Sequence, residues 1–228
     1  MDNEPQSLKD AKVKPSLLTV ITSQGTFLEA VAGVAQIGSD TVHLDTIEFA
    51  KVGADCSVGS WAIATYHLKG GRSTPQALVV RNNIVVIGGW GDLDLIDVYS
   101  NVQTSAVRDD GSPSPWRTAT SLTTGIYGHA TLIEEQQQPN PSLLLSLGGQ
   151  PGAGAYANWI SYAYITSAGS LPDAIGAWRI APTGKIPTGR AGLGAVQLGG
   201  RIYVIGGNDD AGKYYSDVLS ARFEFGQP

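Results

Sequence analysis

The sequence predicts an all-β protein made of four repeats of short antiparallel strands. Two observations support this prediction: the composition favours turns over helices, and one motif of a strand with glycines returns at a nearly constant spacing. The chain has 228 residues, of which 42% are hydrophobic and only 15% are charged, with 29 glycines. That hydrophobic content is ordinary for a folded domain, and abundant glycine with few charges is typical of all-β repeat folds.

Charge and cysteine content narrow the classes of function and location. The net charge of −5 and the pI near 5.1 argue against a broad nucleic-acid surface, because phosphate binding requires clustered Lys and Arg. A single cysteine, Cys56, excludes an internal disulfide framework, and no run of 18 apolar residues could span a membrane. The first residues lack the pattern of a secretory signal, so we expect a cytoplasmic protein, while a leader that has been removed stays open.

A short apolar strand that ends in glycine recurs along the chain. "NIVVIGG" (83–89) returns as "RIYVIGG" (201–207), with "SLLLSLGG" (142–149) between them and a degraded copy, "FLEAVAG", at 27–33. The last glycines of the four copies are separated by 56, 60 and 58 residues: Gly33, Gly89, Gly149 and Gly207. A fixed period of this length is the signature of a repeat architecture.

Tryptophan is a second marker with the same phase. Trp61, Trp116 and Trp178 follow the first three of those glycines by 28, 27 and 29 residues, each after a turn of small residues. Each repeat is therefore predicted to contain four strands, with the fourth beginning at the tryptophan ("WAIATYHL", "WRTATSL", "WRIAPTG"). Because the tryptophans occupy one position of the repeat, we expect them to pack between neighbouring repeats.

The order of apolar strand, Gly-Gly, third strand, glycine turn, tryptophan and "TGR" resembles the Kelch repeat. The resemblance covers roughly residues 15–225 and is closest to bacterial-style units with a "DG…W" turn. It implies a Kelch-like β-propeller with four four-stranded blades, at approximately 15–66, 67–121, 122–183 and 184–228. It says little about function, because propellers of this kind serve many roles.

Ring closure is the open question of this prediction. The last repeat stops at "FEFGQP" before any tryptophan strand, and the N-terminal segment 1–14 stands in the register of the missing strand. That segment is a candidate closing strand, since soluble proteins avoid exposed sheet edges. Three arrangements stay open: two or more chains completing a larger ring, a four-bladed monomer, and a piece of a longer propeller.

The start of the first strand of each repeat supplies the candidate ligand residues. A Gly-Arg pair recurs with Arg72 and Arg190, Gly125 takes the place of the arginine in the third repeat, and Lys14 lies nearby in the first. The resemblance implies that this entrance approaches the central channel, where the arginines would bind an acidic or anionic ligand. The alternative, which we favour, is that they bond carbonyl groups of the neighbouring blades.

A few residues later lie further candidate ligand residues. Gln76, His129 and Gly194 are interpreted as equivalent positions near the axis, with Tyr127 beside them. His129 is a weak candidate for an acid or base, and packing is its favoured role. The three histidines have no metal-ligand spacing, so neither a metal site nor a cofactor is predicted.

These observations favour a non-catalytic binding module whose loops and channel mouth recognise a protein segment or a small anionic ligand. The alternative is a propeller enzyme, such as a lyase, epimerase or cyclase, that acts on a sugar or small metabolite through His129. The expected partners are a protein or a small ligand and further copies of the chain. Nucleic acid and membrane are not expected.

Overall fold

The computed structural model describes residues 7–91, 98–134, 141–152, 154–166 and 171–222. Every helix or strand assigned in these ranges is a β-strand. The same ranges contain no helix long and apolar enough to cross a membrane. The predicted all-β class is therefore confirmed.

Sixteen strands form four antiparallel sheets, one for each repeat of the sequence. The first blade contains β1 (Lys12–Val13), β2 (Ser16–Thr22), β3 (Gly25–Ile37), β4 (Asp40–Val52) and β5 (Ala62–Ile63). The second contains β6 (Gln76–Val80), β7 (Asn83–Ile87), β8 (Val102–Ala106) and β9 (Arg117–Ala119). The third contains β10 (Ala130–Glu134), β11 (Ser142–Leu147), β12 (Ile160–Ile165) and β13 (Arg179–Ile180), and the fourth β14 (Gly194–Leu198), β15 (Arg201–Ile205) and β16 (Val218–Arg222).

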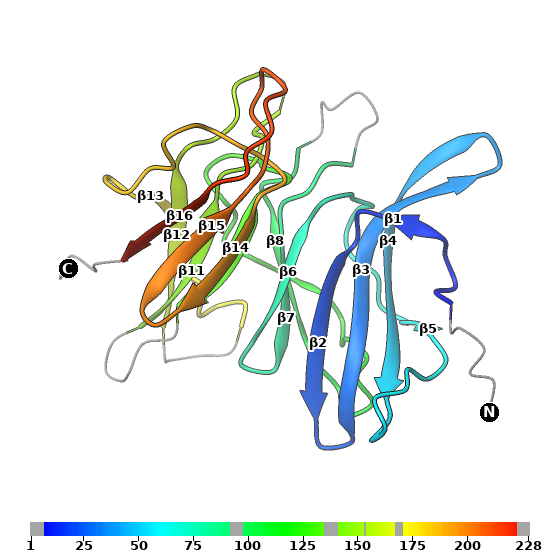
Figure 1. Ribbon diagram of the computed structural model, residues 1–228. Coiled ribbons are helices and arrows are strands. Elements are labelled where there is room, and N and C mark those ends of the chain that lie inside the picture. Colours follow the sequence, from blue (N-terminus) through cyan, green and yellow to red (C-terminus); the bar gives the residue numbers. More distant parts are fainter. Residues whose placement is uncertain (1–6, 92–97, 135–140, 153, 167–170, 223–228) are drawn as a thin grey trace.

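The four sheets are the blades of a four-bladed β-propeller (Figure 1). The innermost strands contact one another in chain order, β2 with β6, β6 with β10 and β10 with β14. Two blades depart from four strands. In the first, β1 and β2 follow one another along the long strand β3, and in the fourth the described part of the chain supplies only three strands. Since β1 pairs with β3 and residues 1–6 lie outside the described residues, a closing-strand role for segment 1–14 stays a prediction.

The second strand of each blade explains why the repeat begins with an apolar run. Strands β7 and β11 are buried along nearly their whole length, because each lies in the middle of a sheet that has a neighbouring blade on both faces. A strand covered on both faces needs apolar side chains at successive positions, as in "IVVI" and "LLLSL". The third strand differs between blades: β8 is buried over four of its five residues, whereas β12 alternates buried and half-buried residues.

The glycine pair that ends the second strand makes a joint between blades. Gly88 and Gly89 have positive φ angles of 62° and 99°, which turn the chain in a way that an L side chain rarely allows. The turn directs the N–H of the second glycine to the next blade. This bond is made three times, at 2.8–2.9 Å, by Gly33 to Arg72 O, Gly89 to Ile126 O and Gly149 to Arg190 O.

A second hydrogen bond accompanies the first at each joint. The N–H of Thr74 donates to the carbonyl of Lys14 in the preceding blade at 3.1 Å, and the equivalent bond of Gly128 to Thr74 measures 3.5 Å. The third copy joins the N–H of Gly192 to the carbonyl of Gly128 at 2.8 Å. Each pair of consecutive blades is thus joined by two backbone hydrogen bonds around the axis.

Side chains fill the space between blades in three apolar cores, one for each pair of consecutive blades. Trp116 lies in the core between the first and second blades, and Trp178 lies in the core between the second and third. Their indole N–H groups donate to the carbonyls of Tyr66 and Thr120, at 3.1 and 3.0 Å. The prediction that the repeat tryptophans pack between blades is confirmed for Trp116 and Trp178, whereas Trp61 is half-buried and belongs to none of these three cores.

One buried carboxyl interrupts the first core. Glu29 on β3 is 1% exposed, opposite Leu18 and Phe49, and neither of its carboxylate oxygens has a hydrogen-bond partner among the described residues. Burial raises its pKa to about 8. The strand registers place Val85 and Leu145 at the same position in the next two blades, so the first blade carries an acid where the others carry aliphatic residues.

This carboxyl predicts a pH-dependent stability. The folded chain holds a proton on Glu29 up to about pH 8, whereas the unfolded chain releases it near 4.5, so the free energy of unfolding falls as pH rises through that window. The loss is up to about 1.4 kcal/mol per pH unit. We expect Glu29→Leu to remove this slope in urea unfolding measured from pH 5 to pH 8, while Asp40→Asn, at an exposed position, retains it. An unchanged slope in Glu29→Leu would assign the effect to another group.

Candidate functional site

The predicted ligand residue Arg72 lies inside its blade. It is 0% exposed, and its guanidinium group donates to the carbonyls of Lys69, Gly70 and Gly88 at 2.8–3.2 Å. It also donates to Asn101 Oδ1 at 2.7 Å and lies over the ring of Tyr99, 4.2 Å from the ring centre. A planar guanidinium with several donors suits this set of carbonyl oxygens at the end of a strand.

Arg190 repeats the arrangement in the fourth blade. It is 1% exposed, donates to the carbonyls of Thr188 and Gly206, and lies 3.9 Å from the ring centre of Tyr215. Its strongest partner is Asp217, with Nη1 and Oδ1 2.6 Å apart. The arginine holds the pKa of Asp217 below its usual value, chiefly by this hydrogen bond. We call these three-residue sets, of an arginine with Tyr and Asn or Asp, the blade staples.

The other two blades replace the staple as a unit. In the third blade the three equivalent positions hold Ile126, Ala157 and Trp159. The equivalence follows from the backbone, since Gly148 N–H donates to Trp159 O as Gly88 N–H donates to Asn101 O. These three are apolar, and they pack in or against the core between the second and third blades. In the first blade Lys12 takes the arginine's place, and its Nζ contacts Thr46 Oγ1 at 3.2 Å and Glu48 Oε1 at 2.8 Å.

The structure therefore corrects three sequence-based alignments. The residue that replaces the arginine in the third blade is Ile126 and not Gly125, and the first-blade cation is Lys12 and not Lys14. His129 is not equivalent to Gln76 and Gly194: those two pair with Ile87 and Ile205, and the third blade places Ala130 there, opposite Leu147.

The partner of each arginine comes from the start of the third strand. Arg72 bonds Asn101, and Arg190 bonds Asp217. The signal that would have found the staple is the shorter match between "VYSN" at 98–101 and "YYSD" at 214–217.

Burial decides how the two arginines act. Their guanidinium groups are not presented to solvent, and they bond carbonyl groups of their own blades and not, as expected, of the neighbouring blades. Recognition of an anionic ligand by Arg72 and Arg190 stays a prediction that these contacts do not favour.

His129 is enclosed at the joint between the second and third blades. It is 1% exposed, and neither ring nitrogen has a hydrogen-bond partner among the described residues. Its Cε1 lies near the backbone of Gly88, and its Cβ lies near that of Gly149. Burial lowers its pKa to about 3, so the ring is neutral at neutral pH. Access to a substrate would require the joint to open, which favours packing over catalysis.

Tyr127 belongs to a row of half-buried aromatic side chains near the blade entrances. Its ring centre lies 5.9 Å from that of Trp90, and Trp90 meets His43 edge to face at 4.7 Å. Burial, and then the neighbouring Tyr156, raise the pKa of Tyr127. Gln76 is half-buried on β6. Sequence analysis missed Trp90, although it directly follows a glycine pair of the repeat.

The described residues bring no three His, Cys, Asp or Glu side chains together in a group that could hold a metal ion.

Comparison with known families identifies the fourth blade directly. The model of the Kelch motif matches residues 189–220, a segment that begins at the Gly-Arg pair and contains the complete staple of Arg190, Tyr215 and Asp217. This match and the four-bladed arrangement together support a Kelch-repeat propeller, and the motif itself is matched in the fourth blade. No curated protein matches it in sequence.

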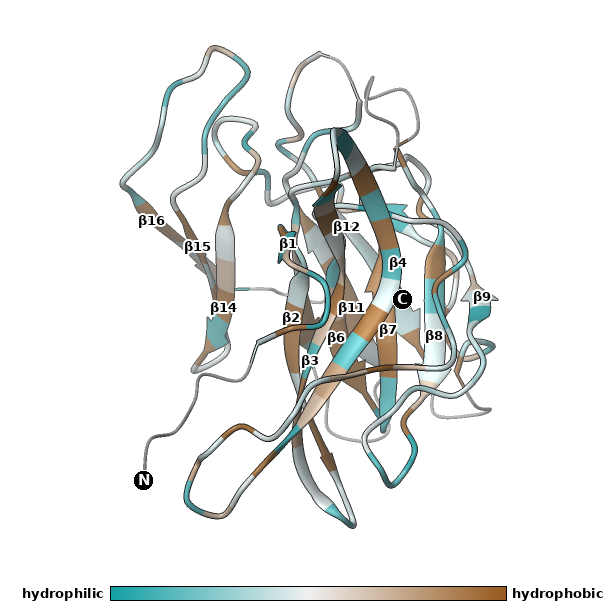
Figure 2. Ribbon diagram, turned by 90° about the vertical axis from the view of Figure 1, so that its right-hand side faces the viewer, coloured by the Kyte–Doolittle hydropathy of each residue, from teal (hydrophilic) through white to brown (hydrophobic). Residues whose placement is uncertain are grey.

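The last Kelch blade leaves open a face that the other blades bury. Leu198 is 71% exposed and Val218 is 61% exposed, whereas the equivalent residues of the first blade, Val20 and Ile47, are 1% and 0% exposed. Val196 and Ile205 lie on the same face and are also exposed. We call this surface the trailing face. It occupies the side of β14–β16 away from the third blade; Figure 2 labels these three strands.

The first blade also leaves apolar side chains exposed, on its face away from the second blade. Leu17 and Ile21 on β2 are 70% and 73% exposed on the side of the blade that faces away from the second blade, which we call the leading face. Trp61, whose counterparts Trp116 and Trp178 are buried, is only half-buried there. Neither joint hydrogen bond is made between the described residues of the fourth and first blades.

The staple predicts a specific loss of stability. Arg190→Met retains much of the side-chain volume but leaves the Gly206 carbonyl without its donor, and we expect the free energy of unfolding to fall by roughly 1–3 kcal/mol. Arg179→Met, at an exposed position on β13, should change it by less than about 0.5 kcal/mol. Urea unfolding measures both. Equal effects of the two substitutions would remove the structural role of the staple.

The buried histidine predicts a slope of opposite sign to that of Glu29. Its pKa is about 3 in the folded chain and near 6.5 in the unfolded chain, so the unfolded chain binds the extra proton and stability falls as pH drops from about 6.5 towards 3. His129→Leu, which installs the residue found at the equivalent Leu193, should flatten this slope in unfolding experiments. His67→Leu, at an exposed site, should not. If His129 were catalytic and exposed, His129→Leu and His67→Leu would not differ in this slope.

Proposed function

We propose that this Kelch propeller is a non-catalytic interaction module, and that its first polypeptide partner is a second copy of the same chain. The observation that carries the proposal is the trailing face, where side chains equivalent to buried core residues are left in solvent. An apolar patch on a folded protein marks an interaction surface. A small anionic ligand is less well supported, because the arginines expected to bind it are buried in staples.

The second copy is proposed because the two open surfaces are halves of a joint that the chain already builds three times. In the first joint, Leu18 and Val20 of β2 pack in one core with Ala77 and Val79 of β6. At the positions of Leu18 and Val20, the trailing face has Val196 and Leu198. At the positions of Ala77 and Val79, the leading face has Leu17 and Thr19. The trailing face of one chain therefore fits the leading face of another.

Backbone groups support the same pairing. The joint requires an N–H from the second glycine of one blade and an N–H from the entrance of the next. Gly207 holds the first position on the trailing side, and Lys14 holds the position of Thr74 on the leading side. Gly192 O is the acceptor equivalent to the carbonyl that Thr74 uses. A second chain would supply partners for both donors.

Such a contact is heterologous, since different surfaces of the two chains meet. Two chains of four blades each would make the contact twice and close an eight-bladed ring with two-fold symmetry. Eight blades lie within the usual range for propellers. We also propose a cytoplasmic location, in line with a single cysteine, Cys56, which is free and exposed.

The enzyme alternative receives no support of its own. It relied on His129, whose ring lies enclosed between two blades, and the neighbouring arginines are held in staples. Loss of a catalytic activity is therefore not the readout by which this proposal is tested.

We expect the purified chain to have a mass of about 48 kDa by light scattering, twice its 23.8 kDa. Leu198→Asp on the trailing face and Leu17→Asp on the leading face should each weaken the dimer, because a charge in an apolar joint is left unpaired. Ile37→Asp, an equally exposed apolar position near the tip of the β3–β4 hairpin, should leave it intact.

Mixing the two face variants tests the head-to-tail geometry. Each variant retains one good face, so a mixture of Leu198→Asp and Leu17→Asp should form a one-to-one complex through a single joint. A monomeric wild-type chain at 100 μM would overturn the proposal of a second copy. Mixed variants that stay apart while the wild type dimerises would overturn the head-to-tail joint.

A further inference from the structure

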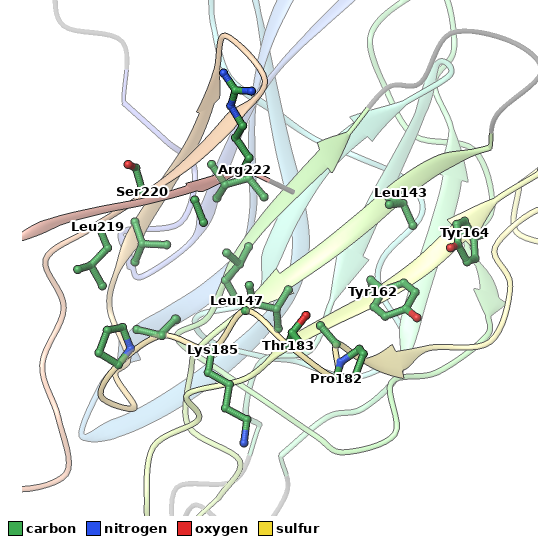
Figure 3. Close-up of a pocket in the computed structure, with 18 residues that line it drawn as sticks. Leu143, Leu147, Tyr162, Tyr164, Pro182, Thr183, Lys185, Leu219, Ser220 and Arg222 are labelled. Carbon is green, nitrogen blue, oxygen red and sulfur yellow. The ribbon is translucent and has the colours of Figure 1, made fainter. Parts of the chain in front are cut away.

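A cavity of about 790 Å³ opens between the third and fourth blades. Leu143, Leu147, Tyr162 and Tyr164 line it from the third blade, and Leu219 and its neighbours on β16 line it from the fourth. The loop 181–187 closes one end, as Figure 3 shows with Pro182, Thr183 and Lys185. The cavity lies on the side of the fourth blade opposite to the trailing face.

The two equivalent spaces in this chain are filled by tryptophan. Trp116 shares the first core with Ala64 and Leu68, and Trp178 shares the second with Leu122. The residues equivalent to Ala64 and Leu68 in the third blade are Ala181 and Ile186, since their N–H groups make the same bonds to the third strand and to the residues before it. Both Ala181 and Ile186 line the cavity. The cavity is therefore a tryptophan site whose tryptophan is missing.

No described strand occupies the place of the strand that would carry that tryptophan. In the first three blades the outer strands β5, β9 and β13 pair antiparallel with β4, β8 and β12. The residue after each tryptophan lies opposite Phe49, Thr104 or Tyr162, and the equivalent residue on β16 is Ser220. Among the described residues, β16 pairs only with β15, so its outer edge is open for a strand in that register.

The five tryptophans of the chain all have other places. Three begin the outer strands of the first three blades, Trp90 meets His43 and Tyr127, and Trp159 packs against the core between the second and third blades. None of them can fill the cavity without leaving its own site.

We propose that the cavity and the edge of β16 form a binding site for an extended segment of another polypeptide that carries a tryptophan. The segment would add to the fourth blade as an antiparallel strand through backbone hydrogen bonds, and its indole would enter the cavity. This site goes beyond the proposed association of two copies, because it uses the opposite side of the fourth blade and leaves the trailing face free.

The three internal strands define what the segment looks like. They read "WAIA", "WRTA" and "WRIA", each after a small residue or proline, so the site selects a tryptophan followed two and three residues later by Ile or Thr and by Ala. The indole N–H also needs an acceptor. Tyr66 and Thr120 supply it in the other joints, each five residues before the glycine of the next entrance, and Gly184 holds that position at the cavity.

The test uses a synthetic peptide with the sequence of residues 174–184, "AIGAWRIAPTG", labelled with fluorescein and titrated with the full 228-residue chain. We expect saturable binding by fluorescence anisotropy. The peptide with alanine in place of tryptophan should bind at least roughly tenfold more weakly, because a buried indole dominates such interfaces. Ala221→Trp, which fills the cavity from β16, should weaken binding to a similar extent, whereas Gln36→Trp, at an exposed site on β3, should not.

The proposal would be overturned by absence of saturable binding to the wild-type chain, or by equal affinity for the tryptophan and alanine peptides. Binding unchanged by Ala221→Trp would place the peptide elsewhere and would overturn it as well, provided that circular dichroism shows the variant to be folded. The Leu198→Asp chain separates this site from the association of two copies. It should bind the peptide with unchanged affinity whether or not the wild type is a dimer.

Discussion

The joint between consecutive blades is the constraint on which the rest of this structure depends. A strand must end abruptly so that a backbone N–H reaches the next blade, which requires glycine with positive φ. The receiving carbonyl belongs to Arg72, Ile126 or Arg190, and in two of these three joints a staple fixes the side chain of the receiving residue. Stability in such a repeat protein is approximately the sum of the blades and their joints. Each joint also buries an apolar face on both blades, so a chain of four blades with three joints has two faces left over.

The staples show that the chain conserves a structural task more closely than the residues that perform it. In the second and fourth blades a guanidinium group with Tyr and Asn or Asp holds the entrance, and in the first blade Lys12 with Thr46 and Glu48 takes its place. In the third blade all three positions become apolar together. The replacement of all three residues together has a physical reason. A lone arginine or a lone acid in that site would be a buried charge without a partner, whereas a matched apolar set packs.

The repeat period was sufficient to predict the blades, their central strands and the tryptophans between them. Glycine and tryptophan keep their positions because a backbone turn and a wedge of fixed size leave few substitutes. The site residues were less predictable, since polar positions tolerate replacement by a different chemistry. A shift of one residue put His129 in the wrong register, and a shift of two put Lys14 in the place of Lys12. Burial was the other missing quantity: sequence shows an arginine near a strand entrance but not whether its guanidinium group faces solvent or carbonyl oxygens.

The two sides of the last blade differ in what they lack, and this difference separates the two proposed partners. Its trailing face exposes apolar side chains, with Arg201 opposite Leu198, and lacks a neighbouring blade, so a folded partner with a matching face is required. Its other side already contacts the third blade and lacks a single strand and a single indole, so a whole blade cannot enter there but an extended segment can. A rigid surface thus selects a folded copy by shape, while the open strand edge with a deep cavity selects a short sequence, and one blade can serve both without competition between them.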